Sequence, residues 1–249
     1  MVLVSAATIF NYCERGRDAS FWAEPLNALS NGAFVMAGVY ALTIFSRQRR
    51  DQRSLAPAFF AVLMIVVGIG SFLFHTYATP WAATADVAPI GIFMLAYFAY
   101  ALRIFLRWHV LAVMAALGAF AAALYSAGDF TCSGDLLPAT AAAGRPCFNG
   151  SLAYVPALLS MLFIGGALVA QRHPAGRRVL MAGLIFLVSL TARTLDFELC
   201  VASKVLGAVR GTHMLWHILN AVTLFLLTTA AIWHGNVSTE SASGEKGRR

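Results

Sequence analysis

The stretch that decides the fold is "GTHMLWHILNAVTLFLLTTAAIW", residues 211–233. It contains no Asp, Glu, Lys or Arg, and it is long enough for an α-helix to cross the hydrocarbon layer of a bilayer, which takes about 20 residues. His213 and His217 are four residues apart, so both imidazoles lie on one face of this helix, one turn apart. An imidazole inside a bilayer is costly to desolvate and needs a partner. The stretch therefore predicts a membrane helix that carries a polar site.

The rest of the chain repeats this apolar pattern. Of its 249 residues, 59% are hydrophobic and only 12% are charged, and the mean hydropathy is +0.72, unlike an ordinary soluble domain. The uncharged runs predict seven membrane helices near residues 27–45, 55–77, 83–102, 109–127, 152–170, 179–196 and 211–233. We therefore expect an all-α fold, a single seven-transmembrane helix bundle over residues 1–235, followed by a disordered cytoplasmic tail at 236–249.

The first ten residues, "MVLVSAATIF", could be mistaken for a signal peptide. They lack a basic n-region and an A-x-A-like cleavage site, and their apolar stretch is short. We therefore expect this segment to remain part of the mature chain.

The basic residues indicate the orientation of the bundle. One side of the predicted bundle holds twelve of the 18 Lys and Arg residues: Arg47, Arg49, Arg50, Arg53, Arg103, Arg107, Arg172, Arg177, Arg178, Lys246, Arg248 and Arg249. The other side holds the remaining six: Arg15, Arg17, Arg145, Arg193, Lys204 and Arg210. The positive-inside rule then predicts an N-terminus outside and a C-terminus in the cytoplasm. The net charge of +7 is explained as a topology signal, so no nucleic-acid partner is expected.

All four cysteines fall on the outer side of this topology, which is oxidising in cell-surface and secretory-pathway membranes. Four cysteines can pair in three ways. A Cys132–Cys147 bond would close one external loop, and a Cys13–Cys200 bond would connect the N-terminal segment to the last external loop. The one-sided distribution therefore favours disulfides over free thiols.

The ionisable residues inside the predicted helices gather in one layer. His75 lies near the outer end of the second helix and Asp86 at the outer start of the third, at the same depth as His213 and His217. Three neutral imidazoles with an open fourth position are typical of catalytic zinc, and a nearby carboxylate typically orients a ligand or its water. Ser71 lies four residues before His75, on the same helix face. The layer predicts a metal site near the outer membrane boundary.

Other functions are compatible with such a layer. The chain could be a metal-stabilised receptor or binding protein without enzymatic activity, or a transporter that uses His and Asp as a proton relay. Metal content separates the transporter from the other two classes, and turnover of a lipid amide separates the enzyme from the receptor. The three remaining histidines are expected to be interfacial, because they lie at cytoplasmic helix ends beside Arg-rich loops: His109, His173 and His234.

The same residues carry a resemblance to the alkaline ceramidase family, which belongs to a larger superfamily of seven-helix membrane hydrolases that includes adiponectin-receptor-like proteins. "YCERGRDASFWAEPLNALSN" resembles the family's Cys-Glu segment followed by Glu-x-x-Asn-x-x-Ser-Asn, with Cys13, Glu14, Glu24, Asn27, Ser30 and Asn31. "SFLFH" matches Ser-x-x-x-His, and Asp86 follows eleven residues later. "LDFELC" resembles the segment with the family's second cysteine, and "HMLWHIL" matches the closing His-x-x-x-His.

The resemblance implies a zinc-dependent hydrolase that cleaves the amide bond of ceramide-like lipids to a sphingoid base and a fatty acid; another lipid amide or ester is the alternative substrate. It implies a Zn²⁺ site formed by His75, His213 and His217. Asp86 would orient and deprotonate the water at this site, and Ser71 would hydrogen-bond the oxyanion. It also implies a disulfide between Cys13 and Cys200. The resemblance also implies that the protein's binding partner is a membrane lipid, its substrate.

A calcium site found in eukaryotic members of the family is altered here. Their Asp-Trp-Cys-Glu-x-Asn segment begins with Asn11 in this chain and ends with Gly16, which has no side-chain oxygen. Asn11, Glu14 and Glu24 are the possible Ca²⁺ ligands that remain. Hard-cation sites with fewer charges bind more weakly. We therefore expect calcium to bind weakly or not to be required.

Overall fold

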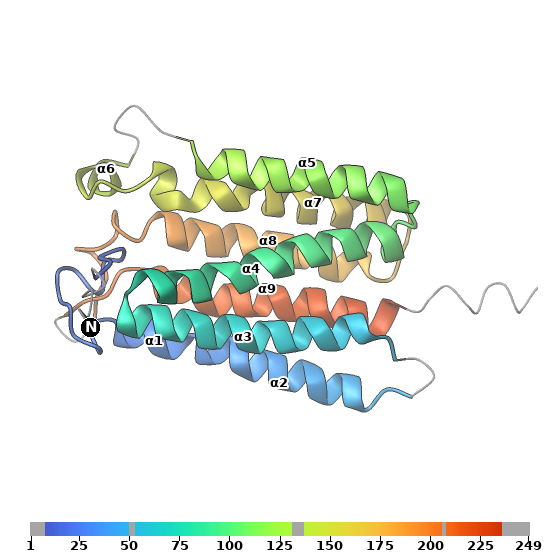
Figure 1. Ribbon diagram of the computed structural model, residues 1–249, viewed down its shortest axis with the longest axis horizontal. Coiled ribbons are helices and arrows are strands. Elements are labelled where there is room, and N and C mark those ends of the chain that lie inside the picture. Colours follow the sequence, from blue (N-terminus) through green and yellow to red (C-terminus); the bar gives the residue numbers. More distant parts are fainter. Residues whose placement is uncertain (1–7, 50–52, 131–136, 206–207, 236–249) are drawn as a thin grey trace, which may run out of the picture.

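The protein is a bundle of long helices that lie side by side (Figure 1). The computed structural model describes residues 8–49, 53–130, 137–205 and 208–235. Its helices are α1 Pro25–Ser30, α2 Gly32–Ser46, α3 Leu55–Tyr77, α4 Pro80–Tyr100, α5 Val110–Gly128, α6 Pro138–Ala142, α7 Val155–Ala170, α8 Gly176–Thr194 and α9 His213–His234. A π-helical turn, Ala101–Phe105, extends α4, and a 3₁₀ segment, Cys147–Tyr154, precedes α7. Two short strands, β1 Lys204–Val205 and β2 Ala208–Val209, pair antiparallel.

Proline and the apolar runs explain where these helices begin. Pro25, Pro80 and Pro138 occupy the first positions of α1, α4 and α6, where the missing N–H is not needed. The side chain of His109 accepts a hydrogen bond from the backbone N–H of Ala112 at the start of α5. Four parts of the sequence prediction lie outside the described residues: the tail at 236–249, most of the segment 1–10, Arg50 and Cys132.

Six helical segments in the described residues are long and apolar enough to cross a membrane: Pro25–Ser46, Leu55–Tyr77, Pro80–Phe105, Val110–Gly128, Cys147–Ala170 and His213–His234. They coincide with six of the seven expected stretches. The remaining stretch forms α8, which packs against α7 and α9. Arg177, Arg178 and Arg193 leave three charges in every 18-residue window of α8, so this helix is not one of the six. The protein is therefore helical and suited to a multi-pass position in a membrane.

Helix α9 is the central element of the bundle. It packs against α1, α2, α3 and α8. In its most apolar 18-residue stretch, 67% of the residues are buried, compared with 11% for α5 at the edge of the bundle (Figure 1). The N-terminal loop, α6 and the β1–β2 hairpin gather at the end of the bundle where α9 begins, which we call the loop end. The first turns of α9 are therefore covered by loops, while the rest of the helix is surrounded by other helices.

Helices α3 and α4 touch through their backbones. A Cβ atom at Gly70 of α3 would lie 2.0 Å from the carbonyl oxygen of Ala85 in α4 and 3.3 Å from the backbone nitrogen of Asp86. No side chain other than hydrogen fits this crossing without a shift of α4. The crossing determines how deeply Asp86 lies relative to α3, because the two helices have no room to slide at this point.

We expect Gly70→Ala to destabilise the protein by about 1–3 kcal/mol, because the added methyl group overpacks a backbone contact. Gly91→Ala on α4 is the matched control, since a Cβ there meets nothing within 4 Å and alanine favours a helix interior. Thermal unfolding in detergent compares the two variants. Equal melting temperatures would contradict the tight crossing.

Candidate functional site

Three buried histidines meet at the loop end. His75 lies in the last turn of α3, and His213 and His217 lie in the first two turns of α9. Their exposed fractions are 0%, 1% and 2%. One ring nitrogen from each lies within 4.8 Å of the others, and the ring centroids are 4.6–5.2 Å apart. Such a group can bind a metal ion, because neutral imidazole is a common ligand for zinc and related metals.

Hydrogen bonds to the other ring nitrogens orient two of these imidazoles. His75 Nδ1 lies 2.6 Å from Glu24 Oε2, and His217 Nδ1 lies 2.8 Å from Ser30 Oγ. A partner on one ring nitrogen is the arrangement that fixes a metal-ligating imidazole. The His213 ring stacks on Tyr12, with centroids 3.9 Å apart. Glu24 and Ser30, at the two ends of α1, therefore determine which nitrogens face the centre.

Two ring nitrogens of the triad remain without a partner. His75 Nε2 and His213 Nδ1 are buried, and neither makes a hydrogen bond to any described residue. A buried polar atom without a partner carries its full desolvation cost, so such atoms in a native protein call for an explanation. A metal ion bound by both nitrogens would remove that cost. The residues present therefore fit a metal ion.

Asp86 and Ser71 lie beside the histidines. Asp86, in the second turn of α4, is 8% exposed, and Ser71, one turn before His75 on α3, is 3% exposed. The side chains of Asp86 and Ser71 are hydrogen-bonded, and the Asp86 carboxylate also interacts electrostatically with His75. The structure thus brings together the carboxylate, the hydroxyl and the three imidazoles that the sequence assigned to one layer.

The three possible calcium ligands are already bound by protein groups. Asn11 Oδ1 accepts a hydrogen bond from Arg145 Nη1 at 2.6 Å. Glu14 accepts from the backbone N–H groups of residues 26 and 27 and from Arg210 Nη1 at 3.0 Å. Glu24 accepts from Arg15, as well as from His75 and Asn27. An arginine therefore contacts each of the three side chains where a hard cation would need free oxygen atoms.

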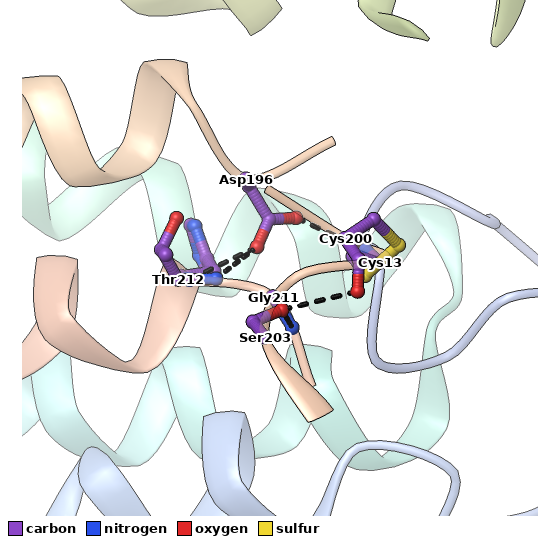
Figure 2. The surroundings of a disulfide bond; sticks show 7 residues. Cys13, Asp196, Cys200, Ser203, Gly211 and Thr212 are labelled. Carbon is purple, nitrogen blue, oxygen red and sulfur yellow. Dashed lines mark hydrogen bonds between the residues drawn. A yellow bond between two sulfur atoms is a disulfide. The ribbon is translucent and has the colours of Figure 1, made fainter. Parts of the chain in front are cut away.

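A buried carboxylate that the sequence analysis passed over holds the start of α9. Asp196, just after α8, is 0% exposed. Its Oδ1 accepts the backbone N–H groups of Thr212 and His213 at 2.8 and 3.0 Å, and its Oδ2 accepts that of Cys13 at 3.0 Å (Figure 2). Burial raises the pKa of the Asp196 carboxyl, and the three N–H groups oppose that rise. Asp196 therefore connects His213, the first histidine of α9, to the N-terminal loop.

The implied disulfide between Cys13 and Cys200 is confirmed, with Cα atoms 5.7 Å apart (Figure 2). The second expected pair, Cys132–Cys147, cannot be described because Cys132 lies outside the described residues. Gly211 passes beneath this bond with a φ of +69°, and a Cβ there would lie 2.2 Å from Asp196 Oδ1. Glycine is therefore required at 211 for both conformation and space. A glycine just before a His-x-x-x-His pattern, with an aspartate shortly after the preceding helix, is the signal that could have indicated this contact.

An apolar cavity lies between α4, α5, α7, α8 and α9. Its lining includes Asn220, which follows His217 by about one turn on α9. The lining continues toward the opposite end of the bundle through Tyr97 and Leu227. An apolar lining of this kind suits a hydrocarbon chain.

The other histidines lie at the opposite end, as expected from the sequence. His109 caps α5, the ring of His173 contacts Phe105, and His234 Nε2 lies 2.9 Å from Arg178 Nη1. None of the three belongs to the group of described residues that could hold a metal ion.

Comparison with known proteins agrees with this site. A family model described as Ceramidase matches residues 5–247, nearly the whole chain. The matched range includes the N-terminal loop with Glu24, the α3–α4 crossing and the two histidines of α9. No curated protein matches the chain. Because the family match covers almost all of its residues, the chain belongs to the Ceramidase family.

Proposed function

We propose that this protein is a zinc-dependent integral-membrane hydrolase that cleaves the amide bond of ceramide-like lipids to a sphingoid base and a free fatty acid. The observation that carries the proposal is the buried triad His75, His213 and His217, with two unpartnered ring nitrogens, beside Asp86 and Ser71. Family membership supports the substrate class. The apolar cavity close to the triad supports a substrate with long hydrocarbon chains.

We further propose that α8 is a seventh membrane span and that residues 1–235 form one domain, followed by a cytoplasmic tail at 236–249. The loop end would face outward. Its described basic residues are fewer than those of the opposite end, which include Arg47, Arg49, Arg53, Arg103, Arg107, Arg172, Arg177 and Arg178. The positive-inside rule supports this orientation. The reacting groups would then lie just inside the outer membrane boundary, at the depth where a ceramide-like lipid presents its amide.

The three histidines would hold the zinc ion, with Glu24 and Ser30 holding the rings of His75 and His217. Zinc bound there would act as a Lewis acid on the amide carbonyl and lower the pKa of a water molecule toward about 7. All three imidazoles are buried, and the neutral imidazole is the form of histidine that binds zinc.

Asp86 would handle the proton. Its carboxylate oxygen takes a proton from the attacking water and passes it to the amide nitrogen, because an amine leaves poorly unless it is protonated. The Asp86 side chain is hydrogen-bonded to Ser71. The Ser71 hydroxyl donates a hydrogen bond and would stabilise the oxyanion of the tetrahedral intermediate. Serine as nucleophile is disfavoured, since the basic nitrogen of its neighbour His75 would be used as a metal ligand.

Removal of a histidine tests the zinc site. We expect about one zinc ion per purified chain, lost in His213→Ala because two ligands hold zinc poorly. His109→Ala is the control, since His109 caps α5 at the opposite end and should keep the metal. Elemental analysis measures the metal, and melting with and without a chelator measures its effect on stability. A protein that carries no zinc and does not respond to added zinc would contradict the site.

Substitutions at Asp86 and Ser71 test the reaction. Asp86→Asn should keep zinc and lose most of kcat for ceramide, while Ser71→Ala should lower the rate about 10²–10³-fold, as expected for one oxyanion donor. Thr84→Ala is the control on α4, because the Thr84 side chain is exposed and bonds only to Pro80. Normal turnover by Asp86→Asn, or a covalent acyl-Ser71 species seen by mass spectrometry, would overturn these roles.

The length of the accepted chain tests the cavity. Ala157→Phe would fill part of the cavity, so kcat/KM for a long-chain ceramide should fall about tenfold relative to a short-chain one, at about 0.8 kcal/mol for each CH₂ group no longer buried. Leu159→Phe is the control on the same helix, because Leu159 is 59% exposed and points away from the core. An equal loss for both chain lengths would contradict chain binding in this cavity.

A further inference from the structure

A deeply buried cation lies directly behind the three histidines. Arg15, in the N-terminal loop, is 2% exposed. Its Nε donates to Glu24 Oε1 at 2.5 Å, and its Nη1 donates to the carbonyl oxygens of Asp18 and Ser20 at 3.1 and 3.2 Å. Its Nη2 donates to the carbonyl oxygens of His75 and Thr76 at 2.8 and 3.4 Å. A guanidinium has five N–H groups, so every one of them has an acceptor.

The acceptors around Arg15 are those that a hard metal cation would choose. One carboxylate oxygen and four backbone carbonyl oxygens form a set typical of calcium sites. The two carbonyls from His75 and Thr76 lie at the C-terminus of α3, where the helix dipole adds negative potential. The same pattern recurs nearby, because Arg210 and Arg145 contact Glu14 and Asn11. The oxygen atoms considered for calcium are therefore neutralised by arginines.

Arg15 reaches His75 by two routes. It binds the backbone carbonyl of His75 directly, and it binds one oxygen of Glu24 while the other oxygen lies 2.6 Å from His75 Nδ1. Asn27 Nδ2 donates to the same Glu24 oxygen at 3.0 Å, which leaves the carboxylate little freedom to turn. With Nδ1 engaged in this way, His75 Nε2 is the nitrogen that faces the other two histidines.

We propose that Arg15 is a permanent substitute for a calcium ion, a positioning residue that holds Glu24 and thereby the metal-ligating orientation of His75. The inference rests on the proposed role of His75 as a metal ligand. A covalently attached cation does not dissociate, so the metal site of this protein is always supported and does not respond to calcium. Asn11, which stands where the family has Asp, contacts a second arginine, Arg145.

The experiment measures metal affinity rather than turnover. Apo-protein is titrated with Co²⁺ or Zn²⁺ against a competing chelator, with no calcium and with millimolar calcium. Wild-type affinity should be the same in both conditions. Arg15→Met should lower the affinity about 10–100-fold, the usual effect of losing the partner that orients a ligand. Arg17→Met is the matched control, because Arg17 lies two residues away and is exposed, and it should behave as wild type.

Arg15→Ala makes the sharper test, because it frees the Glu24 carboxylate and four carbonyl oxygens and leaves space for an ion. Its metal affinity should be low without calcium and should recover when millimolar calcium is added, a dependence that wild type lacks. Arg15→Lys keeps the charge with fewer donors and should lie between Arg15→Met and wild type, which keeps the proposal testable if the alanine variant does not fold.

Two results would overturn the proposal. One is a wild-type metal affinity that rises tenfold or more with calcium; the other is a folded Arg15→Met or Arg15→Lys protein with both wild-type affinity and calcium independence. Measuring ceramide turnover by the wild-type protein distinguishes failure of the inference about Arg15 from failure of the proposed function. Calcium-independent, Arg15-dependent metal binding without turnover would leave the inference standing and remove the enzyme assignment, and calcium-dependent turnover would do the reverse.

Discussion

The Asp196 carboxylate is the contact on which the rest of the site depends. It accepts three backbone N–H groups from two distant segments, the loop at Cys13 and the first turn of α9. These donors include N–H groups at the start of a helix, which have no partner inside the helix and carry positive potential. A single buried charge therefore satisfies the start of α9 and connects it to the N-terminal loop. Because α9 carries two of the three histidines, their position relative to His75 depends on this contact.

Much of the fold could be predicted from apolar runs, because each span in a bilayer has to satisfy its own backbone hydrogen bonds. The expected stretch at 55–77 coincides with α3, and the one at 211–233 coincides with α9 to within two residues. The end of α8 was harder to predict. The run continues through Arg193 to Asp196, but the helix ends at Thr194 because Asp196 is used to hold another segment. The β1–β2 hairpin had no apolar pattern to indicate it.

The residues of the site that lie on helices could be predicted from helix periodicity and from their depth in the membrane. His75, Asp86 and His213 could be assigned to one layer because each lies near the same end of its own helix. The orienting contacts were not predictable, because they join loops to helices over separations that no local pattern encodes. Arg15 looked like one of six basic residues on the outer side, and only the folded chain shows it enclosed by Glu24 and four carbonyl oxygens.

The buried polar groups of the site form two series of hydrogen bonds, and each series ends at a histidine ring. Polar groups inside the bundle have to find partners within the protein, so each contact passes the requirement to the next group. One series runs from Arg15 through Glu24 to the His75 ring, whose Nε2 has no partner. The other runs from Asp196 to the backbone of His213, whose ring Nδ1 has no partner. Both nitrogens belong to the seven buried side-chain atoms that lack a partner in the described residues, and both rings belong to the group that could hold a metal ion. An ion that bound both nitrogens would satisfy the last groups of two separate series, so metal binding would contribute to the stability of the loop end as well as to its chemistry.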